Sequence, residues 1–93
     1  MSTKTTKFDA ADYLDSEEAI AVYLNDALET GSPAEIQLAL GTVARAIGVA
    51  KLAKSAGVGR ESLYKSIREN GKPEFSTVIK IVNAMGLKLQ VAA

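Results

Sequence analysis

The sequence predicts an all-α fold of five helices, followed by one short β-strand at the C-terminus. Two observations predict the helices: apolar residues recur every three to four positions, and serine, proline and glycine mark where these runs begin and end. A third observation predicts the strand, because apolar and polar residues alternate over 87–91. We therefore expect one domain over 16–93, preceded by an extended N-terminal segment over 1–15.

The N-terminal segment combines acidic and aromatic side chains. Residues 1–7 are polar without periodicity and are expected to be loose in solution. The residues that follow are too few to form a core of their own, so their aromatic side chains are expected to dock on another surface. The candidate contact residues of this segment are Phe8, Asp9, Asp12, Tyr13 and Leu14.

The first helix is predicted over 16–30. Asp15 is positioned to cap its start, Glu18 to reach back to that cap, and Gly31 to end it. Apolar residues at helical spacing would bury one face of this helix. They are Ile20, Tyr23, Leu24, Ala27 and Leu28.

The second helix has the stronger start signal. Ser32 can cap it, Pro33 falls at the first helical position where no amide hydrogen is needed, and Glu35 can close a capping box. The apolar stripe continues to Gly48, which ends the helix. Gly41 lies inside this helix, where glycine costs about 1 kcal/mol relative to alanine. We therefore expect another helix to pack closely over Gly41.

Two short helices, 49–56 and 60–70, are predicted on either side of a break at Gly57. Ala53 is small enough for a close approach, Gly57 can adopt a left-handed backbone, and Val58 is expected to point into the core. This pattern predicts a helix-turn-helix, although any antiparallel helix pair joined by a glycine turn has similar spacings. The apolar anchors are Val49, Leu52, Ala53, Ala56, Leu63 and Ile67.

The end of the chain predicts a loop, a fifth helix and the strand. The turn over 70–73 contains glycine and proline and should hold Lys72 out in solvent. Ser76 is positioned to cap a helix that Gly86 ends. Because no other segment alternates, we expect 87–91 to pair with the same strand of a second molecule; the alternative is a short extended tail on the core. The predicted dimer contacts are Leu87, Leu89 and Val91.

Composition excludes most enzyme classes. The chain has no cysteine and no histidine, so it lacks disulfides, a thiolate nucleophile, the commonest metal ligands and a proton shuttle near neutral pH. No spacing of its Asp, Glu, Lys and Ser residues brings a nucleophile and a base together. We expect no enzyme, metal or cofactor. The sequence also lacks a signal peptide and a long apolar run, so we expect a cytoplasmic protein that does not enter a membrane.

The net charge of zero hides a division along the chain. Residues 1–35 hold eight acidic and two basic residues, a net charge of −6. Residues 45–72 hold seven basic and two acidic residues, a net charge of +5. An acidic front and a basic middle predict two partners of opposite charge, although both could be ordinary solvated helix faces.

Polar residues separate the apolar anchors of the second short helix. Arg60, Glu61, Ser62 and Lys65 are free to face outward. In a helix-turn-helix these positions point into the major groove of DNA. The sequence therefore predicts a DNA-binding surface on the helix over 60–70.

Motifs along most of the chain resemble a known family. They are Phe8-Asp9, Tyr13-Leu14, Gly48-Val49-Ala50-Lys51-Leu52-Ala53, Gly57-Val58, Arg60-Glu61-Ser62-Leu63-Tyr64-Lys65, Asn70-Gly71-Lys72-Pro73 and Gly86-Leu87-Lys88-Leu89. With them the sequence resembles the addiction-module antidote proteins, which are related to lambda-repressor-like DNA-binding domains. Gly59 is a departure, because the family usually has serine or threonine there. Glycine in that cap costs only a few tenths of a kcal/mol, so a phosphate contact is in doubt and the fold is not.

The resemblance implies a lambda-repressor-like helix-turn-helix that binds double-stranded operator DNA and represses its own operon. It implies Arg60, Glu61 and Lys65 as readers of base edges, with Ser62 and Tyr64 in support. Tyr64 could equally be a half-buried packing residue. The DNA backbone contacts that the resemblance implies are Lys51, Lys54, Arg68 and Lys72. Gly59, at the cap of the helix over 60–70, is included among the candidate DNA-binding residues.

The resemblance also implies a small basic RelE-like toxin as partner. The acidic N-terminal segment would be steered to such a toxin, with Phe8 and Tyr13 as buried anchors. Two other functions stay open. One is a prophage-type transcriptional regulator without a toxin. The other is a module whose basic face meets an acidic protein rather than DNA, which Glu61 among the readers favours.

Overall fold

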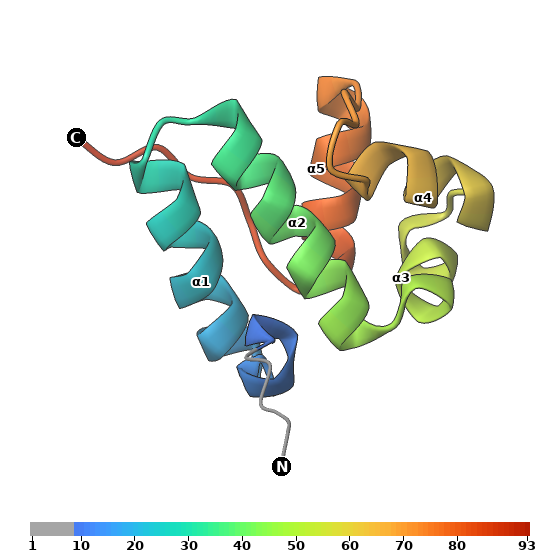
Figure 1. Cartoon of the computed structure of the whole chain (residues 1–93), viewed down its shortest axis with the longest axis horizontal. Helices are drawn as coiled ribbons and strands as arrows, with labels where there is room; N and C mark the ends of the chain where they lie inside the picture. Colours follow the sequence, from blue (N-terminus) through green and yellow to red (C-terminus); the bar gives the residue numbers. More distant parts are fainter. Residues whose placement is uncertain (1–8) are drawn as a thin grey trace, which may run out of the picture.

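The computed structural model describes residues 9–93, and this part of the chain is helical (Figure 1). The predictions for residues 1–7 and Phe8 lie outside it. The all-α prediction is confirmed. The helices are the 3-10 helix η1 (Ala10–Tyr13) and the α-helices α1 (Glu17–Glu29), α2 (Pro33–Ile47), α3 (Val49–Ala56), α4 (Arg60–Ile67) and α5 (Phe75–Ala84). Thus the segment over 1–15, which we expected to be extended, contains a short 3-10 helix.

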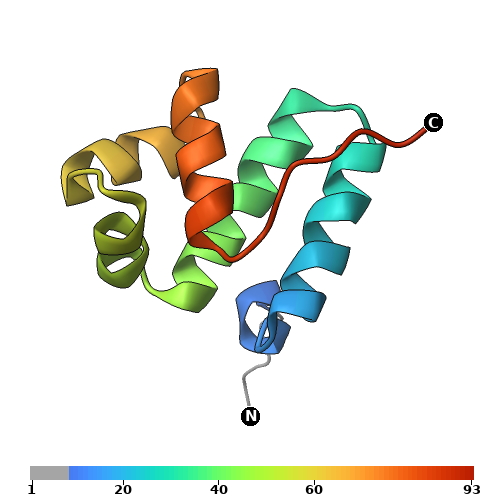
Figure 2. The same ribbon diagram turned by 180° about the vertical axis from the view of Figure 1, so that it is seen from behind.

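Helix α2 is the central element of the fold. It packs against α1 and η1 on one side and against α3 and α4 on the other, while α3 also contacts α5 (Figures 1 and 2). Apolar side chains from all five α-helices meet in one core. Its buried members are Ile20, Leu24, Ala39, Leu40, Val43, Ala44, Leu52, Ala53, Leu63, Ile67, Ile81 and Met85.

Serine side chains cap the two long helices. The Oγ of Ser16 accepts from the amide of Ala19 at 3.0 Å, and that of Ser32 accepts from the amide of Glu35 at 3.3 Å. The prediction of Ser32 as a cap is confirmed, whereas the prediction of Asp15 is wrong by one residue. Ser16 has the extended backbone of a cap, with φ −148° and ψ 159°, which lets its short side chain reach an amide three residues later.

The close approach predicted at Gly41 is confirmed. Gly41 is buried in α2, and a Cβ atom built on it would lie 2.9 Å from the carbonyl oxygen of Ile67. Real Cβ atoms essentially never come so near a carbonyl oxygen. The C-terminal end of α4 therefore rests directly on the backbone of α2.

Two helix boundaries differ from prediction. We expected the helix over 60–70, but α4 ends at Ile67 because Arg68 turns to an extended backbone, with φ −66° and ψ 160°. We expected Ser76 to cap α5, but the helix begins at Phe75, and the carbonyl of Glu74 already accepts from the amide of Val78 at 3.0 Å. The helical hydrogen bonds thus start before Ser76 can act as a cap.

The predicted C-terminal strand is wrong, because within residues 9–93 there is no strand. Gly86, with φ 85°, ends α5, and the amide of Leu87 donates back to the carbonyl of Val82 at 3.2 Å. The tail then runs back across the molecule toward α1 (Figure 2). Leu87 packs on the core and Leu89 lines a groove between α1, α2 and α5. The segment is therefore an extended tail on the core, the alternative given above, although Val91 at its end is fully exposed.

Candidate nucleic-acid interface

The unit formed by α3 and α4 has a sharp turn at Gly57. Gly57 has the left-handed backbone that the sequence predicts, with φ 71°, and ends α3. The amide of Val58 donates to the carbonyl of Ala53 at 3.1 Å, and the Val58 side chain packs against the core. The predicted roles of Gly57 and Val58 are therefore confirmed, and Ala53 is buried as its place on the apolar face predicts.

The core contacts of α4 decide which of its side chains face outward. Leu63 is fully buried and Ile67 is 8% exposed, four residues apart on the inner face of the helix. Between them, Tyr64 and Lys65 are exposed to solvent, while Ser66 is partly buried. The burial of Leu63 and Ile67 therefore determines which face of α4 is exposed to solvent.

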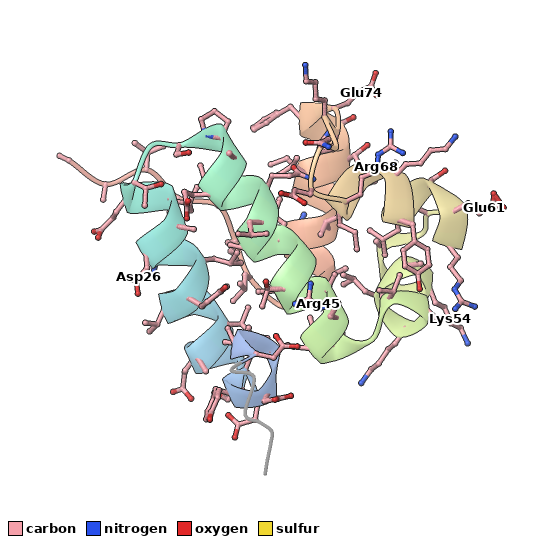
Figure 3. The ribbon with its side chains drawn as sticks, viewed as in Figure 1. Asp26, Arg45, Lys54, Glu61, Arg68 and Glu74 are labelled. Carbon is pink, nitrogen blue, oxygen red and sulfur yellow. The ribbon has the colours of Figure 1, made fainter. Side chains whose placement is uncertain are left out.

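All ten residues predicted to bind DNA are exposed, and they lie on α3, on α4 and on the segments next to α4. Figure 3 shows Lys54, Glu61 and Arg68 on the α3–α4 side, with Asp26 on α1 at the opposite side. We call this set of residues the basic face. It consists of Lys51, Lys54, Gly59, Arg60, Glu61, Ser62, Tyr64, Lys65, Arg68 and Lys72.

Two details of the basic face concern the first half of α4. The Cζ of Arg60 lies 5.8 Å from the centre of the Tyr64 ring, a cation–π contact that orients the guanidinium. Tyr64 is 47% exposed and borders a shallow depression that Leu38 and Val49 also line. About half of its surface is therefore accessible to a partner. Gly59 makes no side-chain cap, as its lack of a side chain dictates.

Lys72 lies on the loop between α4 and α5, exposed as the sequence predicts. Arg68 is the first residue after α4 and is also exposed. These two cations extend the basic face beyond the end of the helix. Their positions depend on the backbone of the loop rather than on helical geometry.

Gln37 is a functional candidate that the sequence reading missed. Its side chain on α2 is 8% exposed, and its Nε2 donates to the carbonyl oxygens of Ser66 and, at 2.9 Å, of Arg68. The one available signal was a polar residue between the apolar Ile36 and Leu38. Sequence alone could not show that its partners lie some thirty residues later.

The acidic N-terminal segment contacts the C-terminal end of α2. Asp9 caps η1 by accepting from the amide of Ala11 at 3.1 Å, and it also accepts from Arg45 at 3.3 Å. Both charged side chains are about half exposed, so this ion pair contributes at most about 1 kcal/mol. Asp12 and Tyr13 are exposed, whereas Leu14 packs against the core. Figure 3 shows Arg45 on α2 near η1, and Arg45 also lines the depression that Tyr64 and Arg68 border.

Acidic side chains of α1 occupy the side of the molecule opposite the basic face. Glu17, Glu18, Asp26 and Glu29 are all exposed. The division of charge along the sequence is therefore also a division in space, because α2 separates α1 from α3 and α4 (Figure 1). A partner of one sign can approach one side without meeting the other.

Two searches of the described residues were negative. Among residues 9–93, no three carboxylates gather closely enough to hold a metal ion. In the same part of the chain, no single helix is long and apolar enough to cross a membrane, and α2 with α3 meets that test only as a pair bent by 101°.

Comparison with known proteins gives two matches. Residues 4–93 match the family described as "Probable addiction module antidote protein". A protein of Haemophilus influenzae, described as uncharacterized, is 42% identical over 91 residues, which is 98% of this chain and 94% of that protein. No solved structure matches the chain. An antidote acts by countering a toxin and is not an enzyme. The chain belongs to the addiction-module antidote protein family.

Proposed function

We propose that this antidote is a DNA-binding antitoxin that represses its own operon and neutralises a RelE-like toxin. The observation that carries the DNA-binding part is the basic face, where α4 is anchored by Leu63 and Ile67 and presents Arg60 and Lys65 to solvent. A short helix held by two apolar anchors can enter a major groove with its outer side. Cations around it would bind phosphates.

Roles within the basic face follow from position. Arg60 and Lys65 on the outer side of α4 would read guanine, and Glu61 would accept from cytosine. Lys51 and Lys54 on α3 would contact phosphates beside the groove, as would Arg68 and Lys72 beyond the end of α4. The α4 N-terminus adds backbone N–H groups, because no side chain caps it at Gly59.

The DNA-binding proposal predicts a steep dependence on salt. The basic face has six cations that could bind phosphates. Arg45 is not counted, because it pairs with Asp9. Each phosphate neutralised contributes about −0.9 to the slope of log affinity against log salt. Fluorescence anisotropy with the duplex upstream of the gene, between 50 and 200 mM salt, measures this slope. Absence of duplex binding at 50 mM salt would refute DNA binding, and an affinity that does not fall with salt would rule out the phosphate contacts proposed for the basic face.

A homodimer is part of the proposal, since operators bound by such helices usually have two half-sites about 34 Å apart. Strand pairing is not its basis. Instead, Leu89 and Val91 on the tail and Leu28 on α1 are exposed apolar side chains, at 42%, 101% and 44% exposure. Packing these side chains against a second copy would remove them from water. Light scattering of the Leu89→Asp/Val91→Asp variant tests this, and an unchanged mass would reject it.

The toxin-binding part rests on the family and on the acidic side of the molecule. An antidote has a toxin as partner, and RelE-like toxins are basic, as the resemblance implies. Asp9, Asp12 and Tyr13 are exposed, and Phe8 directly precedes them in sequence. Calorimetry with the protein encoded beside this gene tests the idea. Deleting residues 1–14, or the Phe8→Ala/Tyr13→Ala variant, should abolish binding; equal affinity would mean that a toxin docks elsewhere.

A further inference from the structure

Gln37 sits beneath the end of the helix that carries the basic face. The amide nitrogen of this side chain donates to the carbonyl oxygens of Ser66 and Arg68, which lie in the last turn of α4 and directly after it. The last carbonyls of a helix have no partner within the helix. Gln37 supplies that partner from α2, across a buried contact.

Gly71, on the loop after α4, also binds one of these carbonyl oxygens. Its amide donates to the carbonyl oxygen of Arg68 at 2.8 Å, so that oxygen accepts from both Gly71 and Gln37. A Cβ atom on Gly71 would lie 2.6 Å from the carbonyl oxygen of Lys65 and 2.9 Å from Nε2 of Gln37. Gly71 is not among the glycines with positive φ, so glycine is required here for space. We call Gln37, Gly71 and the two carbonyls the clamp.

The clamp determines where the chain goes after α4. Arg68 leaves the helix with an extended backbone, and the chain folds back so that Gly71 lies under the last turn. Arg68 carries one of the two clamped carbonyls, Lys72 directly follows Gly71, and both side chains are exposed. Fixing those peptides therefore fixes the spacing of these two cations relative to the outer side of α4.

We propose that Gln37 is a positioning residue for DNA binding, which holds Arg68 and Lys72 in register with the α4 side chains that enter the groove. This inference rests on the proposed DNA-binding function. Gln37 itself is buried and would not touch DNA. It acts through the backbone that carries two phosphate contacts, so it governs affinity for every sequence rather than the choice of sequence.

The test uses Gln37→Met, which keeps a similar length but removes both donated hydrogen bonds. Binding to a mixed-sequence duplex of roughly three helical turns is measured by anisotropy over a range of salt. If both cations lose their register, the slope of log affinity against log salt becomes flatter by about one to two units. The ratio of affinities for the upstream duplex and the mixed duplex stays unchanged, because the base readers are untouched.

Two comparisons separate positioning from loss of stability. Thr42→Val is the matched control, because Thr42 is another buried polar residue on α2 but its hydroxyl donates within the helix, to Leu38 at 3.1 Å. It should lower the melting temperature and leave the slope as in the wild type. In the Arg68→Ala/Lys72→Ala background, Gln37→Met has no cation to misplace and should change the slope no further.

The salt slope of Gln37→Met decides whether Gln37 positions Arg68 and Lys72. A wild-type slope in folded Gln37→Met, or a flatter slope that persists in the Arg68→Ala/Lys72→Ala background, overturns the positioning role while leaving DNA binding in place. If Gln37→Met does not fold, as judged by circular dichroism, the same titration is run with Gly71→Ala, which disturbs the clamp from the loop side. A wild-type protein that binds no duplex at low salt refutes the proposed function itself, and the positioning role with it.

Discussion

Replacing Gly41 by alanine tests how closely α4 rests on α2. Alanine in the middle of a helix is favoured over glycine by about 1 kcal/mol. The new methyl group would lie 2.9 Å from the carbonyl oxygen of Ile67, which is backbone and cannot rotate away. Overpacking of this kind costs about 1 to 3 kcal/mol. The steric term opposes and outweighs the gain in propensity, and we expect a net loss of up to about 2 kcal/mol.

Thermal unfolding followed by circular dichroism measures this loss. For a domain of this size, 1 kcal/mol corresponds to a shift of about 4 to 8 °C in melting temperature. The control is a pair of variants at Leu38, a half-exposed position on the same helix. Leu38→Ala should exceed Leu38→Gly in stability by the propensity term alone. If Gly41→Ala raised stability by the same amount, the Ile67 carbonyl would be free to move and the close-packing argument would fail.

Three further predictions concern the charged faces. Arg60→Ala should weaken binding to the upstream duplex by about 1 to 3 kcal/mol. It should leave the melting temperature unchanged, because Arg60 is exposed. A lower melting temperature with unaltered affinity for the duplex would contradict the role of Arg60 as a reader of bases. Lys72→Ala should weaken binding to all duplexes alike and flatten the salt slope by about one unit, which competition between two unrelated sequences checks. Asp9→Asn should cost less than about 1 kcal/mol in urea unfolding, because its pair with Arg45 is half exposed, and a larger loss would show a deeper role for η1.

Local signals in the sequence account for the parts of the fold that depend on neighbouring residues. Ser32 and Pro33 start α2 because a cap and a missing amide hydrogen act within one turn. Gly57 ends α3 because a left-handed backbone is nearly free of strain only for glycine. The outward face of α4 follows from the spacing of Leu63 and Ile67. These features predict an exposed polar face on α4 without knowledge of the tertiary structure, whereas the positions of Arg68 and Lys72 depend on the loop that follows it.

Other features depend on partners that are distant in sequence, and only the tertiary structure decided them. Residues 87–91 alternate in polarity as a strand would, yet they form a tail in which Leu87 packs on the core and Val91 is fully exposed, so alternation alone could not choose between strand and tail. Helix α4 ends at Ile67, three residues before the expected boundary, where the buried amide of Gln37 holds the carbonyls of Ser66 and Arg68. A hydrogen bond that spans about thirty residues leaves no periodic trace in a sequence, because its geometry exists only once α2 and α4 have packed together.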